Sequence, residues 1–252
     1  MPLMLRKNKI SGRVLILLLC TAMAITSFSQ KTPAYDVIKT SAGNLELHFI
    51  GHGSLMFDFE GFIIHIDPVS SMGSYDGKPS ADLILVTHEH YDHLDPDLIE
   101  KLRKDGTLLF TSENTAKTVK WAQAMKAGDS KNAGTVRIEA VPAYNIVHMR
   151  VQGQPYHPKG AGIGFILTIG DKRIYVAGDT ENIPEMKALK NIDIAFLPMN
   201  LPYTMTPEMV ADAAEALRPR ILYPYHFGET NTDKIEELLK NTNIEIRIRN
   251  LK

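Results

Sequence analysis

The 252-residue chain is 44% hydrophobic and 23% charged, which is the composition of a globular protein with enough length for one large domain and a substantial core. Its 28 basic and 29 acidic residues give a formal net charge of -1 and form no long basic run. These values exclude a largely disordered chain and argue against the basic surface of a nucleic-acid-binding protein.

The first thirty residues differ from the rest of the chain. Four basic residues, at positions 6, 7, 9 and 13, precede the apolar run Val14 to Ile25, and the small residues Ser27 and Ser29 flank Phe28. This layout predicts a secretory signal peptide over residues 1–29, cleaved after Ser29, followed by a single domain over residues 30–252. The apolar run is shorter than the roughly 20 residues that span a bilayer. An uncleaved signal anchor remains the alternative.

Cleavage would change two properties of the protein. The only cysteine, Cys20, lies in the removed segment, and loss of the four basic residues changes the formal net charge from -1 to -5. A mature chain without cysteine needs no disulfide and suits an oxidising compartment. We therefore expect export to the periplasm or the extracellular space, with no membrane span after cleavage.

Alternating and apolar segments predict three strands before residue 67, at 45–50, 54–59 and 62–66, and glycines separate them as tight hairpins require. Asp67 ends the third strand, where its carboxylate would either begin a turn or orient a metal-binding histidine. We expect His52 to be a solvated loop residue.

A dense group of metal-ligand side chains follows the next predicted strand, 83–87. The segment His88-Glu89-His90-Tyr91-Asp92-His93 offers three imidazoles and a carboxylate, which suit zinc, manganese or iron. One small ion cannot easily take all four side chains from so short a loop. The spacing therefore favours two ions, and a His-rich surface turn is the alternative.

The remaining chain predicts helices and strands in alternation. Asp95 and Pro96 begin a helix that ends before Gly106, and Trp121 is expected in the core on a second helix, 113–125. A loop-rich insert, 142–160, carries His148 and His157. The other predicted strands are 108–110, 136–141, 164–169, 173–177, 192–197, 220–225 and 244–248, and the other predicted helices begin at Thr206 and Thr232.

Polar residues stand at the ends of three of these strands. The His88 to His93 loop follows one, Asp179 follows another, and His226 ends a third. Side chains at different strand ends can converge on one rim of a layered fold. A histidine of the insert would complete a set of seven ligands. The similar order of strands and helices in both halves predicts two β-plus-α units packed sheet to sheet.

These residues resemble the metallo-β-lactamase-fold hydrolase superfamily, through the His88 to His93 loop, Gly178-Asp179-Thr180 and His226. Residues 43–248 are similar to a branch of small bacterial and archaeal hydrolases near the ascorbate-lactone hydrolases and N-acylphosphatidylethanolamine phospholipase D. The segments that carry this closer similarity are Gly51-His52-Gly53-Ser54, Ile66-Asp67-Pro68, His157-Pro158-Lys159-Gly160 and Thr204-Met205-Thr206. The resemblance implies an α/β (α+β) fold, a four-layered αββα sandwich.

The resemblance also implies a dinuclear site with two divalent ions. Zn²⁺ is the expected metal, and Mn²⁺ and Fe²⁺ are the alternatives. The first ion would be held by His88, His90 and a third histidine, for which His157 has the better local match and His148 is the alternative. The second would be held by Asp92, His93 and His226, with Asp179 bridging both.

Bound water near neutral pH becomes a hydroxide when a divalent ion lowers its pKa to about 7. We expect a bridging hydroxide, oriented by Asp92 and Asp179, to hydrolyse an ester, lactone, amide or phosphodiester bond of a small substrate, either neutral or anionic. Lys159 is a candidate contact for an anionic group, with a solvated loop lysine as the alternative. Five residues are candidates to line a pocket, and packing in the core is the alternative for each: Tyr144, Tyr156, Met199, Tyr203 and Met205. The alternatives are a non-catalytic metal-binding or sensing protein and a phospholipase D-like lipid phosphodiesterase.

Overall fold

The first half of the chain forms a seven-stranded sheet with the order β1-β2-β3-β4-β5-β6-β7. The computed structural model describes residues 35–252, so the predicted signal peptide lies outside the described residues. The strands β1 to β4 pair antiparallel, and β4 to β7 pair parallel. Their bounds are β1 Tyr35–Thr40, β2 Gly43–Gly51, β3 Ser54–Phe59, β4 Phe62–Ile66, β5 Leu83–Val86, β6 Leu108–Ser112 and β7 Gln123–Met125.

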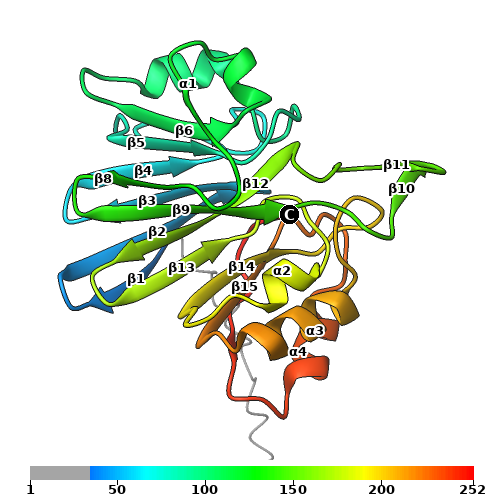
Figure 1. Ribbon diagram of the computed structural model, residues 1–252. Coiled ribbons are helices and arrows are strands. Elements are labelled where there is room, and N and C mark those ends of the chain that lie inside the picture. The colour runs from blue at the N-terminus through cyan, green and yellow to red at the C-terminus, as the bar shows by residue number, and fades with distance from the viewer. Residues whose placement is uncertain (1–34) are drawn as a thin grey trace, which may run out of the picture. The chain divides into compact units, whose positions relative to one another are not determined.

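The second half forms another seven-stranded sheet, with the order β16-β15-β14-β13-β12-β9-β8. In this sheet β13, β14, β15 and β16 are parallel, and β12 pairs antiparallel with β9 and β13. The bounds are β8 Ser130–Ala133, β9 Val136–Ala143, β12 Gly162–Ile169, β13 Lys172–Val176, β14 Ile194–Pro198, β15 Ile221–Tyr225 and β16 Glu245–Ile246. A separate hairpin, β10 Met149–Val151 with β11 Gln154–Pro155, projects from the fold (Figure 1).

Helices cover the outer faces of both sheets (Figure 1). Helix α1, Pro96–Leu102, packs on the outer face of the first sheet, where Leu98 and Ile99 meet Ile84 and Val86 of β5. Helices α2, Pro184–Lys187, α3, Pro207–Leu217, and α4, Asp233–Leu239, lie on the second sheet. The order of layers is therefore helix, sheet, sheet, helix, which confirms the αββα sandwich. No helix within residues 35–252 has the length and apolar character needed to cross a bilayer.

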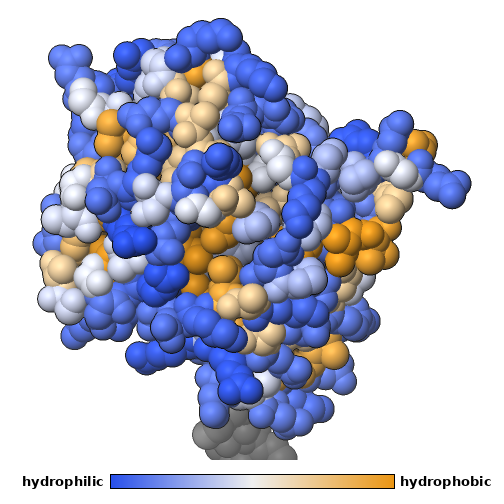
Figure 2. All heavy atoms as spheres, viewed as in Figure 1, coloured by the Kyte–Doolittle hydropathy of each residue, from blue (hydrophilic) through white to orange (hydrophobic). Residues whose placement is uncertain are grey.

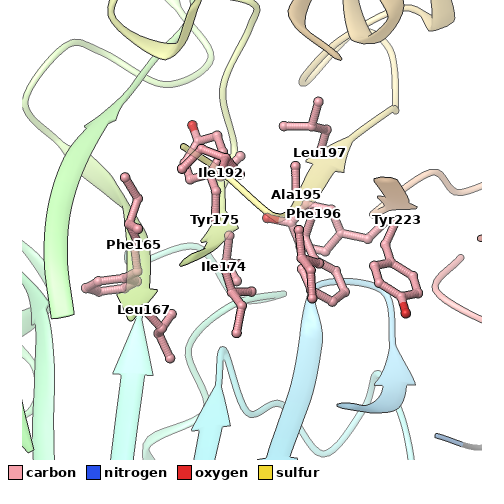
Figure 3. Close-up of a cluster of buried hydrophobic side chains, with 14 of the residues drawn as sticks. Phe165, Leu167, Ile174, Tyr175, Ile192, Ala195, Phe196, Leu197 and Tyr223 are labelled. Atoms are coloured by element: carbon pink, nitrogen blue, oxygen red, sulfur yellow. The ribbon is translucent and has the colours of Figure 1, made fainter. Parts of the chain in front are cut away.

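The main core lies between the two sheets. Leu83 and Leu85 of β5 point into it, whereas the alternate residues Ile84 and Val86 face α1, so this strand is buried on both faces. Figure 3 shows the part of the core contributed by β12 to β15, including Phe196 stacked on Tyr223 with ring centroids 4.7 Å apart.

Two segments differ from their predicted structure. The helix expected over 113–125 is wrong, because the segment holds only a short 3-10 helix, Thr115–Lys117, before β7 pairs as a parallel edge strand with β6. Trp121 is only partly buried, at the edge of the hydrophobic cluster beneath α1, and Arg103 lies over its ring. The insert over 142–160 is also more ordered than expected, since β9 continues to Ala143 and the β10–β11 hairpin follows.

The carboxyl ends of the parallel strands place the predicted ligands at one edge of the sandwich. The segment after β5 begins at Thr87, Asp179 follows β13, and His226 follows β15 directly. In sheets of this kind the carboxyl ends of parallel strands are where ligands bind.

Candidate metal centre

Three histidines form the first ligand group. The Nδ1 atom of His90 lies 3.1 Å from the Nε2 atom of His88 and 3.1 Å from the Nε2 atom of His157. Two nitrogens that bind one tetrahedral ion at 2.0–2.1 Å lie roughly 3.3 Å apart. The three nitrogens therefore have the spacing of ligands around one ion.

The second group contains Asp92, His93, His226 and also His52, whose ligand atoms all lie within 4.8 Å of one another. The Nε2 atom of His226 is 3.6 Å from Oδ2 of Asp92, and the Nε2 atom of His52 is 3.4 Å from the same oxygen.

Asp179 lies between the two groups. Its Oδ2 atom is 3.3 Å from Nε2 of His157 in the first group and 3.4 Å from Nε2 of His226 in the second. Its Oδ1 atom is 3.3 Å from Nε2 of His93. A carboxylate in this position can contact ions in both groups.

Asn145 fixes the tautomer of His157. The amide nitrogen of Asn145 donates to Glu181 and to the backbone oxygen of Tyr203, so its Oδ1 atom must face His157. The Nδ1–H group of His157 donates to that oxygen over 2.7 Å. The Nε2 lone pair of His157 is thus directed at the ligand group.

Asp67 fixes two more histidines in the same way. Its Oδ2 atom accepts from Nδ1 of His93 over 2.8 Å and from the Thr87 hydroxyl over 2.8 Å. Because the Thr87 hydroxyl donates its proton to Asp67, its oxygen accepts from Nδ1 of His88, 3.0 Å away. His88 and His93 therefore also point their Nε2 atoms inward. The orienting role considered for Asp67 is the one that the structure shows.

The chemistry of the donor set fits divalent metal ions. Within residues 35–252, Nε2 of His93, both ring nitrogens of His226 and Oδ1 of Asp179 are buried without a hydrogen-bond partner. Such atoms cost free energy unless a ligand satisfies them. Imidazole nitrogens and carboxylate oxygens in this arrangement are ligands for zinc, manganese or iron.

Two of the ligand side chains already have the charge that metal binding requires, whereas Asp179 and Asp67 outweigh burial and raise the pKa of His93, so that an ion would displace a proton from this ring. Burial lowers the pKa of His88 well below its ordinary value, and the neighbouring His93 adds to this effect, so His88 is neutral. Burial raises the pKa of Asp179, but His226 and His93 lower it by more, so this carboxylate is ionised. Metal binding requires these forms.

The backbone is shaped to bring the rings together. Gly53 has no Cβ, and a Cβ there would lie 2.8 Å from Cε1 of His93. Asp67 and His226 adopt left-handed backbone conformations, with φ of 43° and 49°. Non-glycine residues rarely adopt such angles, and those that do are often found at functional sites.

The structure brings all seven predicted ligands together. They are His88, His90, Asp92, His93, His157, Asp179 and His226. His148, the alternative to His157, lies outside both groups, and its Nδ1 atom is 2.7 Å from Oε1 of Glu181.

The structure also places the other residues that the sequence singled out. His52 is not a solvated residue, because its Nδ1 atom contacts the backbone oxygen of Lys252 and its ring lies 3.7 Å from that of His226. Lys159 pairs with Glu185 over 2.7 Å and is not among the residues that line the cleft. Met199 and Met205 are fully buried in the core and do not line the cleft, whereas Tyr203 does.

Comparison with known proteins gives consistent results. A family model described as beta-lactamase superfamily domain matches residues 46–226. A UPF0173 metal-dependent hydrolase from Symbiobacterium thermophilum is 30% identical over 73% of this chain and 84% of its own length. A second one, from Lysinibacillus sphaericus, is 29% identical over 80% of this chain and 96% of its own length.

Solved structures are similar as well. A protein from Parabacteroides distasonis that was assigned to the metal-dependent hydrolases is 47% identical, with a TM-score of 0.83 over 86% of this chain and 99% of that chain. The metallo-beta-lactamase fold protein YhfI from Bacillus subtilis is 13% identical, with a TM-score of 0.66 over 82% of this chain and 97% of that chain. At that identity the likeness concerns the fold alone.

Proposed function

The chain is a metal-dependent hydrolase of the beta-lactamase superfamily, and from this premise we propose that it binds two divalent ions and cleaves an ester, lactone, amide or phosphodiester bond of a small substrate. The observation that carries the proposal is the position of Asp179, whose oxygens face both ligand groups at 3.3–3.4 Å. A single ion would leave one of these groups without a role.

The carboxylates and the residues that orient the histidines have different roles in the proposed reaction. When bound, the two ions supply a hydroxide near neutral pH and polarise the bond to be cleaved. Asp92 and Asp179 hold and orient the attacking group, since both are ionised acceptors next to the cleft. Asp67 and Asn145 keep the histidine rings in the tautomer that binds.

The cleft beside the ligands suits a small substrate. Its volume is about 400 Å³, and the lining includes Asp92, Asp179, His226, Asn200 and Tyr203. Clefts of roughly 300–1,000 Å³ are typical for small molecules.

The metal content of the purified protein, prepared without chelator, tests the proposal. We expect about two ions per chain in the wild type and about one in Asp92→Ala, because that variant removes a ligand of the second group only. Asp97→Ala, an exposed aspartate on α1, is the matched control and should keep both ions. One ion or none in the wild type, after loading with zinc, manganese or iron, contradicts the dinuclear site.

A second pair of variants tests the third histidine. His157→Ala should lose an ion from the first group, whereas His148→Ala should keep it, because Glu181 already holds that ring outside the cluster. The opposite result would exchange their roles. Hydrolysis of lactones, carboxylic esters, phosphodiesters and β-lactams is then compared with the metal that binds.

Export is proposed from the sequence of residues 1–29. The basic residues, the apolar run and the small residues before Gln30 support it. Mass spectrometry of the protein from its native cell envelope or medium should find a chain that begins at Gln30. An intact chain beginning at Met1 would contradict cleavage.

A further inference from the structure

The cleft carries one strong cation at its rim. Of the residues 35–252 that line the cleft, Arg150 is the only lysine or arginine. The two carboxylates of the lining, Asp92 and Asp179, both belong to the ligand groups. The positive charge of Arg150 is therefore available to a molecule in the cleft.

Arg150 has no structural partner of opposite charge. Other arginines, such as Arg173 and Arg249, pair with carboxylates, but none of the ion pairs among the described residues includes Arg150. Its guanidinium carbon lies 5.3 Å from the centroid of the Tyr156 ring, and Tyr156 meets Tyr203 edge to face at 5.1 Å. The Tyr156 and Tyr203 rings support the Arg150 side chain, while the N–H donors of its guanidinium stay exposed.

The hairpin that presents Arg150 is fixed at its base. The fully buried Glu181 accepts hydrogen bonds from the backbone nitrogens of Ile146, Val147 and His148, over 2.7–2.8 Å, and from the Asn145 amide. Strand β10 begins at the next residue. Because Asn145 also orients His157, the base of the hairpin is tied to the ligand cluster.

The same hairpin also exposes apolar side chains. The side chains of Val147, Met149 and Val151 are exposed on either side of Arg150 in the sequence. In Figure 2 a group of hydrophobic residues lies just below the projecting hairpin.

We propose that Arg150 recognises an anionic group of the substrate at the outer end of the cleft, so that the substrate is an organic anion. The inference rests on the proposed function. A guanidinium binds carboxylate and phosphate oxygens through two parallel hydrogen bonds, which fixes both the position and the charge of the group. Arg150 is thus a specificity residue, and it takes the role for which the sequence made Lys159 a candidate.

Two simple acids of similar length measure this recognition without any turnover. Butyrate has one carboxylate, which the metal ions can take, whereas glutarate has a second carboxylate for Arg150. Calorimetry on the metal-loaded full chain should show glutarate binding roughly 10-fold more tightly than butyrate, the value of one charge-assisted hydrogen bond.

Variants identify the group responsible. In Arg150→Gln the two acids should bind equally, and the affinity for butyrate should be unchanged. In Arg150→Lys part of the preference for glutarate should remain, because lysine keeps the charge but cannot form the two parallel hydrogen bonds of a guanidinium. Lys159→Gln removes the same charge from a neighbouring loop whose lysine is paired with Glu185, so it should leave the preference unchanged.

Three results would overturn the inference: equal binding of the two acids in the wild type, an undiminished preference in Arg150→Gln, or a loss of preference in Lys159→Gln. Failure of the proposed function is read separately, from metal content and from hydrolysis by the same samples.

Discussion

Asp67 shows how much of the site depends on a residue that does not belong to the ligand cluster. It is fully buried, and its two oxygens accept from the Thr87 backbone, the Thr87 hydroxyl and His93. Through these contacts one carboxylate sets the tautomers of two ligand histidines. Partners of this kind usually contribute strongly to metal affinity.

Asp67→Asn should therefore lower metal affinity by roughly 10- to 100-fold. Asparagine tolerates the left-handed backbone at this position, but its amide hydrogens would face the N–H groups of His93 or Thr87. Competition with a fluorescent zinc chelator measures the affinity. Asp58→Asn, which alters a hydrogen bond in the β3–β4 turn, is the control and should bind zinc like the wild type. Equal affinities in both variants would contradict the role of Asp67.

The site residues that could be predicted from the sequence differ from those that could not in how far along the chain their partners lie. The His88 to His93 ligands are concentrated in one short loop, so their residue types alone indicate metal. Glu181 gives no comparable signal, because its partners are backbone nitrogens 33–35 positions earlier in the chain. His52 likewise looks like any loop histidine until His226 and Lys252 are brought beside it.

At the scale of elements, a buried charge network joins strand β1 to the end of the chain. Asp36 on β1 accepts hydrogen bonds from Arg249, from Arg247 and from the Tyr223 hydroxyl on β15. The inward-facing residues of β1 are Asp36 and Ile38, while Val37 is 51% exposed. The buried Asp36 and the exposed Val37 interrupt the usual alternation, in which apolar residues face inward, so the sequence did not predict β1 as a strand.

Asp36→Asn should lower the free energy of unfolding by roughly 2–3 kcal/mol, because it leaves two partly buried arginines without their common carboxylate. Denaturant unfolding measures the change. Asp171→Asn breaks the exposed pair with Lys172 and should cost much less, because water screens exposed pairs. Similar losses in the two variants would contradict a special role for the β1 network.

The same network predicts a dependence on pH. Burial raises the pKa of Asp36, but hydrogen bonds from Tyr223 and Arg249 lower it by more, so the net pKa lies below its ordinary value of 3.8. A carboxylate with a lowered folded-state pKa contributes stability that is fully present above the unfolded pKa and is lost as pH falls through the folded one. The difference in stability between the wild type and Asp36→Asn should therefore shrink below about pH 4. A constant difference from pH 7 to pH 3 would contradict this assignment.

At the scale of the whole molecule, the ligands come from both sheets. Those at 88–93 follow β5 of the first sheet, whereas Asp179 and His226 follow β13 and β15 of the second. The repetition of strands and helices in the two halves indicated this arrangement, and the family resemblance supplied the four layers. The projecting β10–β11 hairpin had no such signal, since its strands are only three and two residues long.

Ions bound between the sheets should stabilise the folded chain, because the unfolded chain does not hold these ligands together. At a free metal concentration 1,000 times the dissociation constant, the gain is about 4 kcal/mol, less any binding to the unfolded chain. For a domain of this size that gain raises the melting temperature by roughly 8–16 °C. Calorimetric melting with zinc and with chelator measures it. His226→Ala should show a clearly smaller gain, because it removes the second-sheet ligand of the second group, while His148→Ala should show the full gain. An equal gain in His226→Ala and the wild type would mean that metal does not join the sheets through this residue.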